Sequence, residues 1–139
     1  MEVNAIENGI VSDHLRAGTG LKVLSYLNVD KRGDMVALIM NAQSNKLGRK
    51  DVIKFENMSD VDLAALGLID CGATANYIEN GELVRKVKLA LPESVTNVIK
   101  CKNPRCVTSV EPEIPHIFLL VDAQSEEYRC KYCDEIVRF

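Results

Sequence analysis

The sequence contains two short cysteine clusters, CKNPRC at Cys101–Cys106 and CKYC at Cys130–Cys133, with 23 residues and no other cysteine between them. Each cluster fits a tight turn, and Asn103-Pro104 makes the first turn rigid. Two thiolate pairs at these spacings can surround one metal ion tetrahedrally and leave no open position for water. The pattern therefore predicts a closed structural metal site with the ligands Cys101, Cys106, Cys130 and Cys133.

The ligand set favours zinc, one ion per chain, but spacing alone does not separate zinc from iron in a rubredoxin-like site. Four basic residues flank the ligands, and their charge would favour thiolates and offset the negative charge of the centre. These residues are Lys102, Arg105, Arg129 and Lys131. The fifth cysteine, Cys71, stands alone, and we expect it to be a small core residue.

The composition excludes some classes of protein. Of the 139 residues, 47% are hydrophobic and 27% are charged, which is typical of a folded globular chain. No apolar run approaches the roughly 18 to 20 residues that span a bilayer, and the N-terminus lacks the features of a signal peptide. We therefore expect a cytoplasmic protein without membrane contact, in a compartment where clustered cysteines bind metal or react rather than form disulfides.

The charge balance disfavours nucleic-acid binding. The net charge is −3, and the segment from residue 98 to the end carries six Lys or Arg against seven Asp or Glu. A surface that follows a phosphate backbone needs an excess of basic groups. A zinc-ribbon nucleic-acid-binding or transcription protein is the alternative, and protein contact is the better hypothesis for the cysteine segment.

The first part of the chain alternates strand and helix patterns. Strands are predicted from Gly9 (GIVSDHL), at Met35–Ala42 and from Asp51 (DVIKFEN), and helices from Leu21 (LKVLSYLNV) and from Ser59 (SDVDLAALGLI), where Ser59 with Asp62 resembles a capping box. TANYIEN and ELVRKVKL form a hairpin around Asn80-Gly81. The order β, α, β, β, α, β plus one strand is that of a ferredoxin-like split βαβ domain, in which one sheet face stays free for a ligand or partner.

The predicted fold class is α+β with two domains. A linker at LPES, Leu91–Ser94, contains a proline that fixes the backbone and disfavours helix before it. We place the antiparallel sheet domain with its two helices at residues 1–95 and a small β-rich zinc-binding domain at residues 96–139. No constellation of residues supports catalysis, since there is no phosphate-cradling glycine loop and no Cys-His pair at motif spacing.

Taken together, several stretches resemble the regulatory chain of aspartate carbamoyltransferase over the whole length. They are GIVSDH, GRKDVIKFEN, ATANYIENGELVRK, the LPE linker, CKNPRC and CKYC, in this order and spacing. The resemblance implies a non-catalytic allosteric subunit of pyrimidine biosynthesis that binds CTP, ATP or UTP. It also implies that regulatory chains pair, and that the zinc domain holds the catalytic chain.

The same resemblance implies the effector-binding residues. They are Ala5, Ile6, Val11, Asp13, His14, Lys54, Asn76, Ile78, Leu83 and Lys86. In the family, the positions of Asp13 and Lys54 contact ribose or base, and those of His14 and Lys86 approach the phosphates. This is reasonable chemistry, because a triphosphate needs cations or N–H donors to replace its water. Without the resemblance, Asp13 and His14 would be a surface or strand-end feature, and Lys54 and Lys86 would be solvated strand lysines. We expect Lys46 to lie in a solvated loop.

Overall fold

The computed structural model describes residues 3–29, 33–59 and 61–138 of the chain. The chain divides into two compact units, Met1–Ala90 and Leu91–Phe139, and the division in the sequence falls at the start of the LPES stretch. Within the described residues, no helix is both long enough and apolar enough to cross a membrane.

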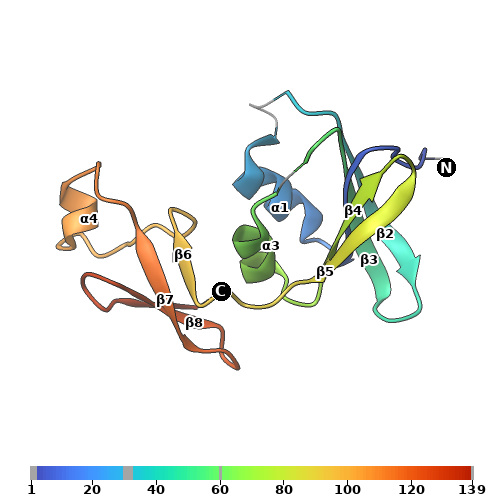
Figure 1. Ribbon diagram of the computed structural model, residues 1–139. Coiled ribbons are helices and arrows are strands. Elements are labelled where there is room, and N and C mark those ends of the chain that lie inside the picture. The colour runs from blue at the N-terminus through green and yellow to red at the C-terminus, as the bar shows by residue number, and fades with distance from the viewer. Residues whose placement is uncertain (1–2, 30–32, 60, 139) are drawn as a thin grey trace. The chain divides into compact units, whose positions relative to one another are not determined.

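The first unit contains a five-stranded sheet and two helices (Figure 1). In chain order these are β1 (Gly9–Arg16), α1 (Gly20–Leu27), β2 (Val36–Ser44), β3 (Gly48–Glu56), α3 (Leu63–Ile69), β4 (Thr74–Glu79) and β5 (Glu82–Lys88). The strand order is β2-β3-β1-β4-β5, and every neighbouring pair is antiparallel. The first four strands follow the order of the split βαβ fold, with β5 added at one edge, so the ferredoxin-like prediction is confirmed.

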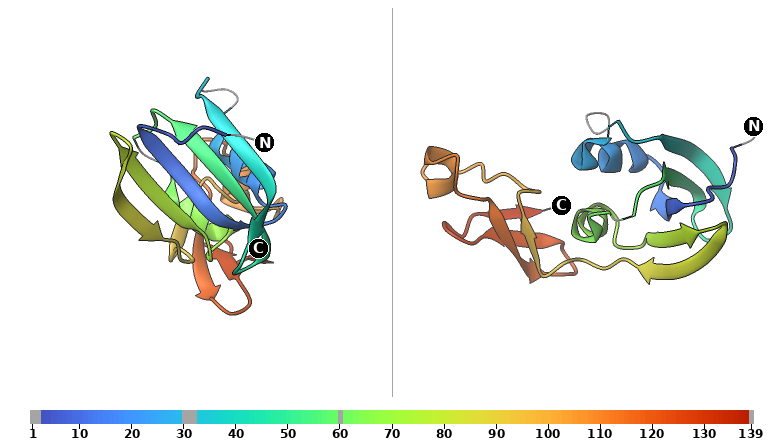
Figure 2. Two further views of the ribbon diagram at one scale, coloured as in Figure 1. Left: turned by 90° about the vertical axis from the view of Figure 1, so that its right-hand side faces the viewer. Right: turned by 45° about the horizontal axis from the view of Figure 1, so that its top comes forward.

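Both helices lie on the same face of this sheet (Figure 2). On that face the side chains of Ile10, Ile53 and Phe55 are completely buried, as is Val23 of α1. Because side chains alternate along a strand, the residues between them point to the opposite face. That opposite face, which no helix covers within this unit, is called the open face below.

The predicted hairpin and the second helix differ in how well local sequence specifies them. Asn80 and Gly81 have φ values of 52° and 78°, as expected for a two-residue hairpin turn, and Glu79 pairs with Glu82 across it. Helix α3 starts later than predicted, at Leu63, and its cap is Asp62, whose carboxylate accepts a hydrogen bond from the Ala65 amide at 3.1 Å. Ser59 is therefore not the cap, and Asp60 lies outside the described residues.

The second unit is a four-stranded antiparallel sheet of order β6-β7-β8-β9, with one short helix. Its elements are β6 (Ser94–Thr96), α4 (Val107–Val110), β7 (Ile117–Asp122), β8 (Glu127–Cys130) and β9 (Ile136–Arg138). Phe118 and Tyr128 are its large, fully buried side chains, and the Tyr128 hydroxyl donates to the Pro92 carbonyl at 2.6 Å. This core is small, and the four predicted ligands lie beside it.

Candidate metal centre and effector surface

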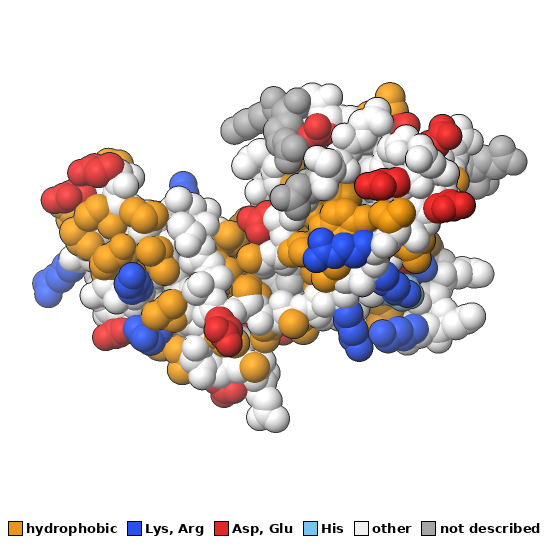
Figure 3. Space-filling model, in the orientation of Figure 1, with side chains coloured by type: hydrophobic (Ala, Val, Ile, Leu, Met, Phe, Trp, Pro, Cys, Tyr) orange, Lys and Arg blue, Asp and Glu red, His pale blue; other side chains and the backbone are white. Residues whose placement is uncertain are grey.

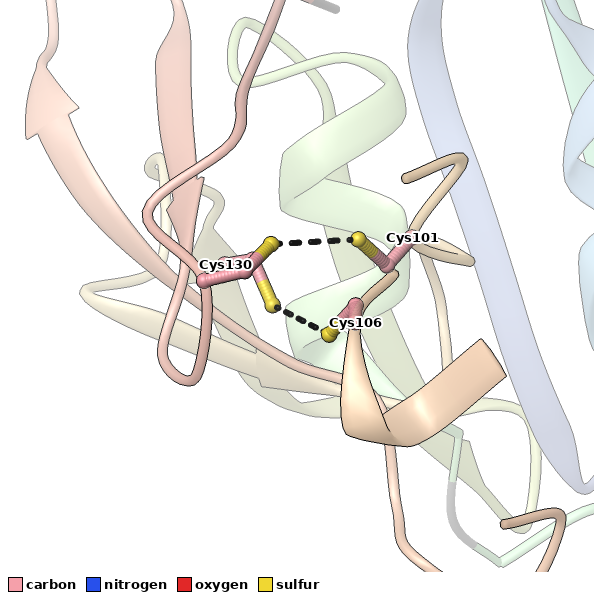
Figure 4. A group of neighbouring side chains, drawn as sticks. Cys101, Cys106 and Cys130 are labelled. Carbon is pink, nitrogen blue, oxygen red and sulfur yellow. Dashed lines mark hydrogen bonds between the residues drawn. The ribbon is translucent and has the colours of Figure 1, made fainter. Parts of the chain in front are cut away.

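The four predicted ligand cysteines converge in the second unit, although 23 residues separate the two pairs. Cys101 and Cys106 bracket the loop before α4, and Cys130 ends β8 (Figure 4). Cys133 lies in the turn before β9. The Sγ atoms of Cys101 and Cys133 are 3.6 Å apart, and those of Cys106 and Cys130 are 3.7 Å apart. All four sulfur atoms lie within 4.8 Å of one another.

These separations fit a metal ion at the centre of the cluster. A tetrahedron of four thiolates with Zn–S bonds of about 2.3 Å has edges of about 3.8 Å. A disulfide would need sulfur atoms about 2.05 Å apart, so neither close pair is one. The cluster can therefore hold one ion with four protein ligands, and both geometry and ligand type fit structural zinc.

Three of the four cluster thiols have shifted pKa values. Burial raises the pKa of Cys101 to about 12, and burial likewise raises the pKa of Cys130. In contrast, the hydrogen bond between the Thr108 hydroxyl and the Cys106 sulfur, 3.1 Å long, lowers the pKa of Cys106 to about 7. Four thiolates so close together repel one another, and a divalent metal would supply the charge that keeps all of them ionised.

Backbone contacts fix the ligand loops. In the first loop, the Cys106 amide donates to the Asn103 carbonyl at 3.1 Å, and the Cys101 amide donates to Nδ1 of His116 at 3.1 Å. Sequence analysis gave His116 no role, because no short motif connects it to the cysteines. Arg129, predicted to offset thiolate charge, pairs instead with Asp134 at 2.9 Å.

The prediction for Cys71 was wrong, because this thiol is exposed rather than in the core. It lies in the turn after α3, next to the buried carboxylate of Asp70. Asp70 accepts hydrogen bonds from the amides of Arg16 at 2.6 Å and Gly72 at 3.0 Å. These bonds hold the Asp70 side chain in the turn, while Cys71 beside it is exposed.

Four of the predicted effector residues form one row across the open face. Strand pairing aligns Lys54 on β3 with Val11 on β1, Val11 with Asn76 on β4, and Asn76 with Lys86 on β5. Directly paired residues point to the same face of an antiparallel sheet. The structure thus brings into one row side chains that are as far apart in the sequence as Val11 and Lys86, which 75 positions separate.

The other predicted residues border this row on two sides. Ile78 and Leu83 pair with each other near the hairpin turn, and Leu83 is 58% exposed. Ala5 and Ile6 belong to the segment before β1, which runs close by, because the Lys54 ammonium donates to the Asn4 carbonyl at 3.2 Å. Ile6 is buried and Ala5 is exposed. This end of the open face is therefore its apolar end.

Asp13 and His14 lie on the other side of the row, where β1 bulges. The pairing of β1 with β3 shifts between Ser12 and Leu15, and His14 has a φ of 59°. The bulge lets the His14 amide donate to the Asp13 carboxylate at 2.7 Å, and places Nδ1 of His14 3.4 Å from the Thr74 hydroxyl.

Sequence analysis missed Lys50, whose ammonium lies 2.9 Å from the Asp13 carboxylate. Burial alone would raise the pKa of Asp13, but the hydrogen bonds from Lys50 and from the His14 amide outweigh burial and hold that pKa below its ordinary value. A signal was present, because Lys50 precedes Lys54 by four residues on one strand and therefore shares its face. The strand had been predicted to begin only at Asp51.

Asn76, in the middle of the row, has a buried side-chain oxygen. Among the described residues, no group donates a hydrogen bond to its Oδ1. Because protein atoms enclose this oxygen, a ligand on the open face does not contact it in this conformation.

Comparisons with known proteins agree with the division of the chain into two units. Residues 1–90 match the family model described as aspartate carbamoyltransferase regulatory chain, allosteric domain, and residues 93–139 match the one described as its metal binding domain. Together they define the class of protein, which is a regulatory chain that combines an allosteric domain with a metal-binding domain. Such a chain is a non-catalytic subunit.

Curated relatives show the same similarity over nearly the whole chain. The aspartate carbamoyltransferase regulatory chain of Clostridium botulinum is 54% identical over 136 residues, which are 98% of this chain and 93% of the relative. That of Clostridium acetobutylicum is 52% identical over 99% of this chain and 94% of its own. That of Bifidobacterium longum is 50% identical over 97% of both. The chain belongs to the family of aspartate carbamoyltransferase regulatory chains, and the catalytic chain of that enzyme is its partner.

Proposed function

We propose that the open face of the first unit binds nucleoside triphosphates, namely CTP, ATP and UTP, as allosteric effectors. The row across the open face, with Lys54 and Lys86 at its two ends, is the observation that supports this most directly. A nucleotide offers phosphate oxygens to the lysines. The remaining contacts would come from the rest of the predicted set, with Ala5, Ile6, Ile78 and Leu83 at the apolar end and Asp13 and His14 at the other.

In this proposal the second unit attaches the chain to catalytic subunits. Its core is small, so the metal bound by the four cysteines would determine the shape of the docking surface. Pairs of regulatory chains would join catalytic trimers, as the family resemblance implies, and the assembly would work in the cytoplasm. The metal-binding role rests on the converging thiols, and the docking role rests on the family.

Regulation then follows from linkage between two binding equilibria. A nucleotide changes the activity of the assembly only if it binds one quaternary state more tightly than another, and the effect equals that difference in affinity. Such couplings are typically about 1 to 3 kcal/mol. CTP and ATP would act differently where their bases make different contacts at the apolar end of the open face.

A substitution in the row tests the effector site. Lys86→Ala removes a cation from the open face. The binding free energy of CTP should become less favourable by about 1 to 3 kcal/mol, as for the loss of a charge-assisted hydrogen bond. Lys46→Ala, in the exposed loop between β2 and β3, removes the same charge outside the row and should leave the affinity unchanged. Calorimetric titration of the full chain measures both. Equal CTP affinity in wild type and Lys86→Ala would place the effector site elsewhere.

A further inference from the structure

The tripeptide Glu-Asn-Gly occurs twice in the chain, once at the entry to β1 and once in the turn between β4 and β5, and the fold brings the two copies into contact. The backbone amide of Asn80 donates to the side-chain oxygen of Asn8 at 3.1 Å. The backbone amide of Gly81 donates to the Glu7 carbonyl at 2.8 Å. These two hydrogen bonds, called the turn clamp below, hold the segment before β1 against the hairpin turn.

Asparagine followed by glycine is the dipeptide most prone to spontaneous deamidation, because glycine has no side chain to hinder attack by its backbone nitrogen. In this reaction the glycine nitrogen loses its proton and attacks the asparagine Cγ, and the side-chain nitrogen leaves as ammonia. Water then opens the resulting succinimide ring and gives aspartate or isoaspartate. One water is consumed and one ammonia is released, so the reaction needs no oxidant or reductant.

The two asparagines differ in how firmly the fold holds the reacting groups. Gly9 is buried in β1 between β3 and β4, and a Cβ added to it would collide with the Phe55 carbonyl, so its backbone has little room to move. Asn80 and Gly81 are exposed, and among the described residues the Asn80 side chain takes part in no hydrogen bond. In this copy, what holds the attacking nitrogen is the turn clamp.

We propose that Asn80 is a deamidation site and that the turn clamp sets the rate of the reaction. The Gly81 nitrogen cannot attack while its N–H donates to the Glu7 carbonyl, because the attack requires the loss of that proton. The turn adds to the protection, since φ values of 52° and 78° define the conformation of its two residues. Deamidation therefore occurs in molecules whose clamp has opened, and its rate follows the fraction of such molecules.

Deamidation of Asn80 adds a negative charge to a turn that is already acidic. Glu79 and Glu82 pair across this turn and are exposed, and Asp and Glu side chains gather around this end of the unit (Figure 3). Like charges on paired strands destabilise the pairing, and isoaspartate also lengthens the backbone of the turn. The modified turn should therefore loosen the clamp and release the segment that contains Ala5 and Ile6. A lower nucleotide affinity would follow, and this consequence rests on the proposed function.

Mass-spectrometric peptide mapping of the full chain, stored at neutral pH and sampled over time, measures both copies at once. In guanidinium chloride the two copies should deamidate at similar rates, because the tripeptides are identical. In the folded chain, Asn80 should deamidate more slowly than in guanidinium chloride but faster than Asn8.

Variants at Asn8 test the clamp itself. Asn8→Ala removes one of its two bonds and should speed deamidation at Asn80 about two- to tenfold, as expected for the net contribution of one hydrogen bond. Asn8→Asp should keep the wild-type rate, because a carboxylate oxygen accepts the same hydrogen bond. Asn4→Ala is the matched control, since the Asn4 side chain makes no hydrogen bond within the described part of the chain.

Three results would overturn the assignment. They are an Asn80 rate in the folded chain that does not exceed the Asn8 rate, an Asn80 rate as high as in guanidinium chloride, and an unchanged rate in Asn8→Ala. Calorimetric titration with CTP tests the consequence separately. Chain deamidated at Asn80 should bind CTP more weakly than fresh chain, and equal affinities would overturn that consequence alone. If fresh chain binds no CTP, the proposed function fails, while the mass measurements still decide the deamidation site.

Discussion

Replacement of one thiolate ligand, Cys130→Ser, should unfold the second unit while the first unit stays folded. The second unit has about 50 residues, and a core in so small a domain rarely supplies more than about 3 to 5 kcal/mol. Structural zinc contributes about 10 to 16 kcal/mol in comparable small modules. Cys130 is completely buried and its sulfur lies 3.7 Å from that of Cys106. Loss of this ligand therefore costs more than the rest of the unit can offset.

Metal analysis and thermal unfolding measure this effect. Wild type should contain about one zinc per chain, and Cys130→Ser should lose the metal and the unfolding transition of the second unit. The matched control is Cys71→Ser, because Cys71 is the cysteine outside the cluster and is exposed. CTP binding should survive in both variants, since it belongs to the other unit. Stoichiometric zinc and an unchanged unfolding transition in Cys130→Ser would refute the metal site as described.

Three further predictions concern the first unit. The pKa of Asp13 is held below its ordinary value of 3.8, so the ion pair with Lys50 should stabilise the fold at pH values above 3.8. This stabilisation should be lost as the pH falls through the lower pKa of the folded state. Acid unfolding of Asp13→Asn should therefore lack this pH-dependent loss of stability. Asp51 is fully buried and accepts three backbone N–H groups, so Asp51→Ala should cost at least about 3 kcal/mol in urea unfolding, and a cost below 1 kcal/mol would contradict these contacts. Asp62→Ala should destabilise α3 by about 1 kcal/mol in the same assay, whereas Ser59→Ala should have little effect.

Local sequence chemistry was enough to predict much of this structure. Asn80-Gly81 specified its hairpin because both residues readily adopt the positive φ of such turns. The cysteine spacing specified the ligand set for a similar reason, since each pair closes its own turn. Alternating side chains from Val52 to Phe55 indicated a half-buried strand at β3, because one buried face requires that pattern.

Long-range geometry explains what was missed. The ion pair between Lys50 and Asp13 depends on the bulge at His14, and no periodicity in the sequence marks that extra residue. His116 directly precedes β7, so its hydrogen bond with the Cys101 amide depends on where the sheet places β7. The cap of α3 was misplaced by three residues because Ser59 and Asp62 are both good capping residues, and only the observed helix start separates them.

Reconstitution with catalytic subunits tests the central claim most directly. Purified catalytic trimers are assembled with wild-type chain or with Lys86→Ala, and the rate is measured against aspartate concentration with CTP, with ATP and with no nucleotide. We predict that CTP and ATP shift the wild-type curve by different amounts, and that Lys86→Ala assembles equally well but needs higher nucleotide concentrations for the same shift. An assembled wild-type enzyme whose curve is unchanged by either nucleotide would contradict the account.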